Sequence, residues 1–262
     1  MSRANAGYLR CGMPYNKLGR GPRPLVIFQG LMFENKPLPG LATWMYNFLG
    51  EDYTAYSVLR KPGMPHGYTL RDMAGDYAAM IREEFGGPVD VIGISTGGSI
   101  VQQFAADHPD LARRLVIHSS AHTLCAAGKA VQIEVGQLAR QCRWQEAWKA
   151  MLRFTLQPAW LAGPLAWFAS LLLSLDKPKH PADLVITIEA EDQFNFMARL
   201  PEIAAPTLVV AGERDPFYTP NLFCETAEGI PNARLVLYPG MGHPASGKQF
   251  QRDVLAFLRE EN

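Results

Sequence analysis

The sequence predicts an α/β fold, in which a mostly parallel central sheet is covered by helices on both faces. Three observations predict it. Short β-branched or apolar runs alternate with helical segments along most of the 262 residues. The run that begins at Val89 has the composition of a strand buried on both faces. Between about Ala121 and Pro201 the alternation stops, which indicates an inserted group of helices.

Each predicted element has its own local signal. Strands are expected at residues 8–18 (one or two edge strands), 25–28, 53–59, from 89, and at 115–118, 207–212 and 234–238. Helices are expected at residues 41–49, from 69 to about 85, from the elbow glycines to about 107, and at 222–227 and 248–260. Thr69 and Asp72 form a candidate capping box for the second of these helices. Leu184–Ile188 is the one candidate strand in the inserted region.

These elements divide the chain into three segments. Residues 1–120 form the first part of a core, residues 121–201 a helical insertion, and residues 202–262 the second part of the core. The chain is long enough to bury one sizeable core.

Composition and charge exclude several kinds of partner. Apolar residues make up 48% of the chain, and its 25 basic residues balance its 25 acidic ones. No basic run forms a phosphate-binding stripe, so no nucleic acid is expected. Cys and His show no metal-ligand spacing, and neither a metal nor a cofactor is predicted. Residues 1–7 are small and polar, so no signal peptide is predicted there. A cytoplasmic location with reduced thiols is predicted from four scattered cysteines: Cys11, Cys125, Cys142 and Cys224.

The segment Pro158–Leu175 contains no charged residue, which raises the question of a membrane span. Gly163 and Pro164 interrupt it, and proline is expected to break a helix there. We therefore predict helices that line an apolar pocket and no membrane span. Contact with a lipid surface is the alternative.

A nucleophile elbow is predicted at Gly93-Ile94-Ser95-Thr96-Gly97, between a strand and a helix. Small residues are needed where a strand turns at once into a helix, because the backbone segments approach closely. The first N–H groups of the helix lie beside the serine hydroxyl and can bind a negative oxygen. The alternative is that these glycines only allow close packing.

A catalytic serine needs a base, and the base needs an acid that orients it. Asp215 follows the strand 207–212 and is the predicted acid, with Glu213 in reserve; the alternative is that Asp215 caps a helix or pairs with Arg214. His243 follows the strand 234–238 between glycine and proline and is the predicted base. His118 and His122 are candidates for the pocket wall.

The oxyanion of a tetrahedral intermediate needs two N–H donors. One is expected from the backbone of Thr96, next to the nucleophile. The other is expected from the loop after the strand 25–28, and Leu31, which follows Gly30, fits best.

The order of these motifs resembles the α/β-hydrolase fold family over nearly the whole chain. The resemblance implies a triad of Ser95, Asp215 and His243, and a helical cap at residues 121–201. Two features depart from the family pattern: Gln29 stands where many relatives have histidine, and the loop at Arg60 lacks the Asp-x-Arg-Gly pattern.

The predicted function is that of a serine hydrolase that cleaves esters of small to medium apolar acyl or aryl groups through an acyl-enzyme. Lactonase, thioesterase, carbon–carbon bond hydrolase and perhydrolase activities on the same triad remain alternatives, as does a non-catalytic small-molecule receptor. The partner is a small-molecule ester, and the oligomeric state stays open. The predicted pocket residues, for which core packing is the alternative, are Met32, Phe33, Trp144, Trp160, Trp167 and Met241.

Overall fold

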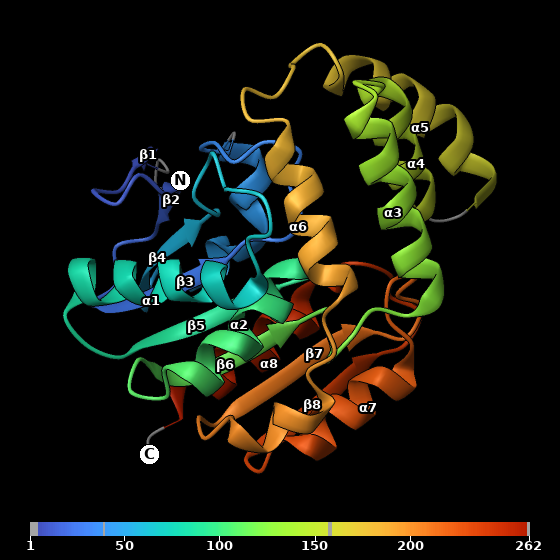
Figure 1. Cartoon of the computed structure of the whole chain (residues 1–262). Coiled ribbons are helices and arrows are strands. Elements are labelled where there is room, and N and C mark those ends of the chain that lie inside the picture. The colour runs from blue at the N-terminus through green and yellow to red at the C-terminus, as the bar shows by residue number, and fades with distance from the viewer. Residues whose placement is uncertain (1–4, 39, 157–158, 261–262) are drawn as a thin grey trace.

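The computed structural model describes residues 5–38, 40–156 and 159–260, and its core is an eight-stranded sheet (Figure 1). The strand order is β1-β2-β4-β3-β5-β6-β7-β8. β1 and β2 pair antiparallel, β2 also pairs antiparallel with β4, and all remaining pairs are parallel. The predicted mostly parallel sheet is therefore confirmed. The strands are β1 (Asn5–Tyr8), β2 (Pro14–Leu18), β3 (Arg23–Phe28), β4 (Tyr53–Val58), β5 (Val89–Ile94), β6 (Ala112–His118), β7 (Thr207–Gly212) and β8 (Ala233–Tyr238).

Helices cover both faces of this sheet. One apolar layer joins the sheet to α1 (Leu70–Phe85), α2 (Thr96–Asp107) and α7 (Pro220–Gly229). The opposite layer joins it to the 3₁₀ helix η1 (Gly40–Leu49) and to α8 (Lys248–Arg259). Because the sheet is covered on both sides, every residue of β5 and β7 is buried, and neither strand alternates between polar and apolar residues.

A helical insertion follows β6 and precedes β7 (Figure 1). It consists of α3 (Ala126–Arg140), α4 (Trp144–Thr155), α5 (Ala159–Leu173) and α6 (Ala182–Asp192). The insertion has its own small apolar core between α3, α4 and α6. The short 3₁₀ helix η2 (Met197–Glu202) contacts α2 and α7 instead. The helical insertion is as predicted, whereas the domain limits at residues 120 and 201 stay a prediction.

Two local predictions in this insertion are wrong. The candidate strand Leu184–Ile188 is part of α6, which is buried on several sides, so its apolar residues lack the period of a surface helix. Pro164 does not break α5, which runs through it. Pro164 is the sixth residue of that helix, so its missing N–H removes a single hydrogen bond from the helix near its start.

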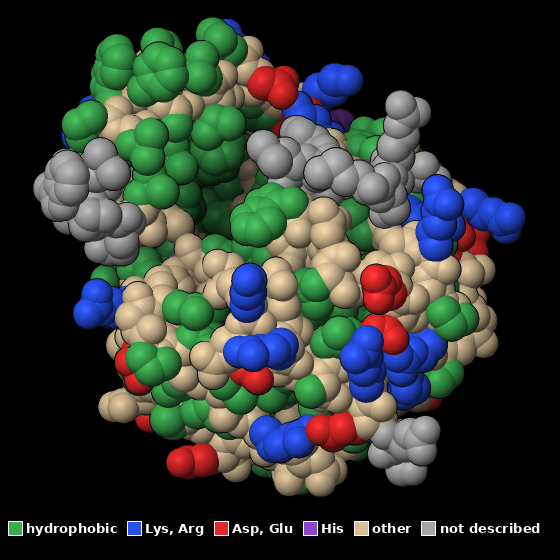
Figure 2. Space-filling model, turned by 180° about the vertical axis from the view of Figure 1, so that it is seen from behind, with side chains coloured by type: hydrophobic (Ala, Val, Ile, Leu, Met, Phe, Trp, Pro, Cys, Tyr) green, Lys and Arg blue, Asp and Glu red, His purple; other side chains and the backbone are tan. Residues whose placement is uncertain are grey.

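The outer side of α5 exposes large apolar side chains. Figure 2 shows hydrophobic side chains gathered over the helical insertion. No helix within the described ranges is long and apolar enough to cross a membrane. The exposed apolar residues of this segment are Leu165, Trp167, Phe168, Leu171, Leu172, Leu173 and Leu175.

The predicted capping box at the start of α1 is confirmed. The Thr69 hydroxyl accepts a hydrogen bond from the Asp72 N–H at 3.2 Å, and the Asp72 carboxylate accepts one from the Thr69 N–H at 2.9 Å.

We expect Thr69→Ala to lower the free energy of unfolding by about 1 kcal/mol, because an N-cap side chain contributes about that much. Urea denaturation measures it. Thr69→Ser keeps the hydroxyl and serves as the control, and equal stability of the alanine variant would contradict the prediction.

Candidate active site

The predicted elbow lies where β5 passes directly into α2. Ser95 has φ 53° and ψ −125°, a left-handed backbone conformation that is uncommon for a residue with a side chain. Close packing holds it there. A Cβ on Gly97 would lie 2.0 Å from the Phe28 carbonyl oxygen, and a Cβ on Gly93 would lie 2.5 Å from the Gly97 carbonyl oxygen. Only glycine fits at these two positions.

The structure brings the three predicted triad residues together in one hydrogen-bonded chain. Ser95 Oγ lies 3.0 Å from His243 Nε2, and His243 Nδ1 lies 2.7 Å from Asp215 Oδ2. Because a carboxylate only accepts, Nδ1 carries the proton and donates to Asp215. Nε2 is then free to accept the proton of the Ser95 hydroxyl, as a general base must.

Asp215 is held by its own turn. Its Oδ1 accepts hydrogen bonds from the backbone N–H groups of Phe217 at 2.9 Å and Tyr218 at 3.3 Å, and its side chain is fully buried. Both carboxylate oxygens are therefore committed, one to the backbone and one to His243. Glu213, the reserve acid, is exposed.

The loop that carries His243 is fixed from both sides. Its Met241 carbonyl accepts from the Arg214 N–H at 2.8 Å, next to the triad acid. Further along, Ala245 donates its N–H to Ser119 Oγ at 2.9 Å, and its carbonyl lies 2.7 Å from His118 Nε2. The base is therefore tied to the ends of β6 and β7, the strands on the far side of β5 from the start of the chain.

His118 supports this loop and does not line the pocket. A carbonyl only accepts, so His118 Nε2 donates to Ala245, and Nδ1 accepts from the Tyr46 hydroxyl at 2.7 Å. Burial lowers the pKa of His118 to about 3, despite the hydrogen bond to Ala245. His122 is also buried, and its Nδ1 lies 3.2 Å from Thr226 Oγ1. Both histidines are structural residues.

The predicted oxyanion loop passes directly beside the nucleophile. A Cβ on Gly30 would lie 3.2 Å from the Ser95 Cβ. Arg60, which is buried, donates to the carbonyls of Gln29 at 3.0 Å and Gly30 at 2.9 Å. In a trans peptide the C=O and the next N–H point in opposite directions. Because the Gly30 carbonyl faces Arg60, the Leu31 N–H points away from Arg60.

Gln29 and Arg60 lie at the two places where the chain departs from the family pattern, and both act on this loop. The Gln29 side chain donates to Ser57 Oγ at 2.6 Å, and the Arg60 guanidinium holds two successive carbonyls. Burial lowers the pKa of Arg60. The sequence placed Arg60 in a variable loop and gave no sign of this contact.

Glu191 was not predicted at all. It lies on α6, is buried, and accepts from Thr96 Oγ1 at 2.7 Å and Ser99 Oγ at 2.9 Å. It also accepts from Gln132 Nε2 on α3 at 3.1 Å. Burial raises the pKa of Glu191, and these three donors oppose that rise. The insertion is thereby joined to Thr96, the residue after the nucleophile.

A cavity of about 230 Å³ is lined by both the nucleophile Ser95 and the base His243. Of the predicted pocket residues it includes Met32, together with Leu31 of the oxyanion loop. Gln132, Met151 and Thr155 contribute the wall formed by the insertion. The lining is Gln29, Gly30, Leu31, Met32, Ile94, Ser95, Gln132, Met151, Thr155, Phe217, His243 and Pro244.

The other predicted pocket residues lie elsewhere. Phe33 stacks on Trp148 with ring centroids 3.6 Å apart, and Trp144 is buried in the same small core of the insertion. Trp167 is 52% exposed on α5, and Met241 packs against the apolar layer under α8. The alternative of core packing therefore holds for Phe33, Trp144 and Met241. The side chain of Trp160 lies outside the described residues.

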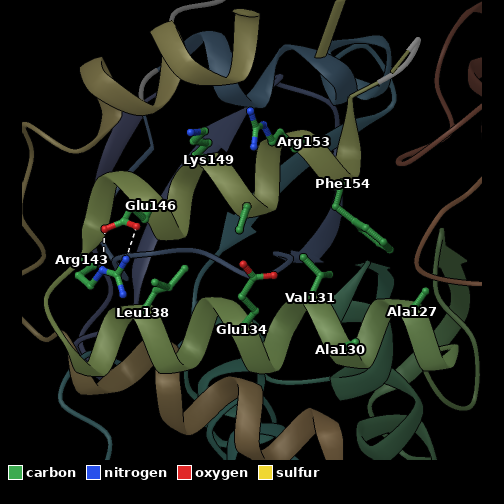
Figure 3. A pocket seen from close by; sticks show the side chains of 11 residues that line it. Ala127, Ala130, Val131, Glu134, Leu138, Arg143, Glu146, Lys149, Arg153 and Phe154 are labelled. Carbon is green, nitrogen blue, oxygen red and sulfur yellow. Dashed lines mark hydrogen bonds and ion pairs between the residues drawn. The ribbon is translucent and has the colours of Figure 1, made fainter. Parts of the chain in front are cut away.

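A larger cavity, of about 860 Å³, opens between α3 and α4 (Figure 3). Glu134 and Val131 face it from α3, and Lys149 and Arg153 from α4, while Arg143 and Glu146 form an ion pair at one end. Its lining contains none of the triad residues, so size alone does not identify the reactive cavity. Among the residues that the structure describes, no group of three His, Cys, Asp or Glu side chains could hold a metal ion.

The low pKa of His118 makes stability depend on pH. Above its ordinary value of 6.5, His118 is neutral in both states; between 6.5 and about 3 only the unfolded chain binds a proton. Stability contributed by this site is thus lost as the pH falls below 6.5, by about 1.4 kcal/mol per pH unit. Only the part of the interval below pH 6.5 contributes. Between pH 7.5 and 5.5 we therefore expect wild type to lose about 1.4 kcal/mol more free energy of unfolding than His118→Gln. Equal losses, measured by denaturant titration, would show that His118 titrates normally.

Comparison with known proteins relates the chain to one family. The profile of the Alpha/beta hydrolase family matches residues 38–253. The polyketide synthase ThaQ of Burkholderia thailandensis is 40% identical over 82 residues, 30% of this chain, and the match spans only 4% of that protein's length. A 2-hydroxy-6-oxononadienedioate/2-hydroxy-6-oxononatrienedioate hydrolase of a Pseudomonas species is 24% identical, over 96% of this chain and 93% of that protein.

Solved structures share the fold. The enol-lactonase from Burkholderia xenovorans LB400 superposes with a TM-score of 0.77 at 20% identity, over 98% of this chain and 100% of the other. At that identity the likeness establishes the architecture alone.

Proposed function

The chain belongs to the alpha/beta hydrolase family, and we propose that it is a serine hydrolase that cleaves carboxylic ester bonds through an acyl-enzyme. The observation that carries the proposal is the continuous chain from Ser95 through His243 to Asp215, at 3.0 and 2.7 Å, beside a cavity. A buried acid that orients a histidine, which in turn reaches a strained serine, is an arrangement that activates a nucleophile.

The proposed reaction has two halves. His243 Nε2 takes the proton as Ser95 Oγ attacks the ester carbonyl, and Asp215 stabilises the imidazolium that forms. The backbone N–H groups of Leu31 and Thr96 bind the negative oxygen of the tetrahedral intermediate. His243 then gives its proton to the departing alcohol. In the second half, His243 takes a proton from water as the water attacks the acyl carbonyl. The bond between the acyl carbon and Ser95 Oγ then breaks, His243 returns the proton to Oγ, and the acid is released.

The size and lining of the cavity support small to medium acyl groups. Its volume of about 230 Å³ lies below the range of roughly 300–1,000 Å³ that drug-sized ligands occupy. Met32, Met151 and Phe217 provide apolar surface beside the nucleophile. Methionine adapts to irregular ligands, which suits a site that accepts more than one acyl chain.

Lactone hydrolysis is the second candidate, because a lactone is an internal ester and uses the same steps. An enol-lactonase is one of the proteins that share this fold, but the fold alone does not select among these reactions. Carbon–carbon bond hydrolysis is the third, since a Pseudomonas relative named for a dienedioate substrate aligns over most of the chain. Thioesterase and perhydrolase activities would also use this triad. A receptor would not need His243 and Asp215 in this alignment.

A substrate panel tests the proposal. We expect wild type to hydrolyse short p-nitrophenyl esters or lactones, and Ser95→Ala to lose about a thousand-fold or more in kcat, because the three residues act as one unit. Thioesters and dienone acids complete the panel. Ser174→Ala, beyond the end of α5, is the matched control and should keep full activity. Failure of wild type on every ester and lactone would refute the proposal, and full activity of Ser95→Ala would refute the site.

Arg60 tests the oxyanion loop. We expect Arg60→Lys to lower kcat by about ten- to a hundred-fold with little change in KM, because lysine cannot hold both carbonyls of Gln29 and Gly30. A misplaced Leu31 N–H would weaken an interaction made mainly in the transition state. Steady-state kinetics on the best ester of the panel measures both constants. Arg71→Lys, at an exposed ion pair with Asp107, is the control. A rise in KM at constant kcat would assign Arg60 to substrate binding instead.

A further inference from the structure

Gln132 lines the reactive cavity, and its side chain carries a buried polar atom without a partner among the described residues. It lies on α3, is only 3% exposed, and lines the cavity that contains Ser95. Its Nε2 donates to Glu191 Oε2 at 3.1 Å. Its Oε1 is buried and has no hydrogen-bond partner within the described parts of the chain.

Glu191 fixes which end of the amide is unpaired. The carboxylate already accepts from two hydroxyls, those of Thr96 at 2.7 Å and Ser99 at 2.9 Å. Gln132 Nε2 faces the same Glu191 oxygen that accepts from Thr96, so the amide turns its N–H₂ group toward Glu191. The carbonyl oxygen of Gln132 is then left without a donor.

An unpaired buried carbonyl is costly, and native structures provide it with a partner from the protein, water or a ligand. Met151, a neighbouring residue of the same wall, shows that an apolar side chain fits this cavity. Packing alone does not explain a glutamine here, because its unpaired carbonyl oxygen costs free energy that an apolar side chain would not. A substrate donor in the cavity would remove that cost, and water would do so when the cavity is empty.

We propose that Gln132 Oε1 accepts a hydrogen bond from an O–H or N–H group of the substrate, so that the enzyme prefers acyl compounds that carry such a donor over purely alkyl ones. This inference rests on the proposed function and names the substrate class of that site. Glu191 is the positioning residue that orients Gln132.

The position of the donor follows from the small size of the cavity. Gln132 and Ser95 line the same cavity of about 230 Å³. The substrate donor therefore lies within a few bonds of the reacting carbonyl. A hydroxyl on the second or third carbon of the acyl chain meets this condition, and so does one on a short alcohol.

Matched substrate pairs test the preference. The first pair is p-nitrophenyl butyrate and p-nitrophenyl 3-hydroxybutyrate; the second is propyl butyrate and 2-hydroxyethyl butyrate. For wild type we expect kcat/KM to favour the hydroxylated member of one pair by about tenfold, the effect of one hydrogen bond to a buried group. The pair that responds shows which side of the ester faces Gln132.

Two variants separate this role from structural support. Gln132→Met removes the acceptor at similar volume, and Glu191→Gln lets the Gln132 amide turn around. Both should abolish the preference, and because the readout is a ratio between two substrates, a general loss of activity cancels. Gln137→Met, at an exposed position of the same helix, should keep the preference of wild type.

Equal kcat/KM within both pairs for wild type, or an unchanged preference in Gln132→Met, would overturn the inference while the proposed function stands. If wild type hydrolyses no ester or lactone, the proposed function fails. Calorimetric binding of 3-hydroxybutyrate and butyrate then decides the inference alone. Tighter binding of the hydroxy acid, lost in Gln132→Met, would support it, and equal affinities would overturn it.

Discussion

The close approach of backbone segments at the end of β5 is the constraint on which the site depends. Gly97 packs against the Phe28 carbonyl so tightly that a Cβ would lie 2.0 Å from its oxygen. This packing fixes the start of α2 against the end of β3. Ser95, which joins β5 to α2, must therefore take a left-handed conformation. Its hydroxyl then faces His243, and the loop at Gly30 lies beside it. Strain at one residue is offset by the packing around it.

Much of the fold was predictable because the signals are local. The capping box at Thr69, the apolar strand Thr207–Gly212 and the alternation of strands with helices are visible within short windows of sequence. Errors arose where tertiary packing overrides the local pattern. α6 is covered by both the insertion and the core, so Leu184–Ile188 carries apolar residues on several sides of the helix. The apolar residues therefore do not recur with the period of 3.6 residues that identifies a surface helix. Pro164 is tolerated near a helix start.

The candidate site divides in the same way. Ser95, Asp215 and His243 were predicted because each follows a strand, and the C-terminal ends of parallel strands meet at one edge of the sheet. Glu191 and the contacts of Arg60 were not, since a buried side chain in a helix or variable loop gives no sign of its distant partner. Glu191 and Thr96 are 95 residues apart. The prediction that tryptophans line the pocket failed for a related reason. A large apolar side chain fits a core as well as a pocket, and the sequence does not distinguish the two.

The buried carboxylate of Glu191 links the two parts of the molecule. Taking a charge out of water is costly, and burial accordingly raises its pKa. Apolar side chains would join α6 to α2 at lower cost, so stability is a weak reason for a glutamate at this point. A carboxylate does what a leucine cannot: it orients the hydroxyl of Thr96 and the amide of Gln132 at the same time. One carboxyl group therefore orients a side chain of α2, next to the nucleophile, and a side chain of the insertion that lines the cavity.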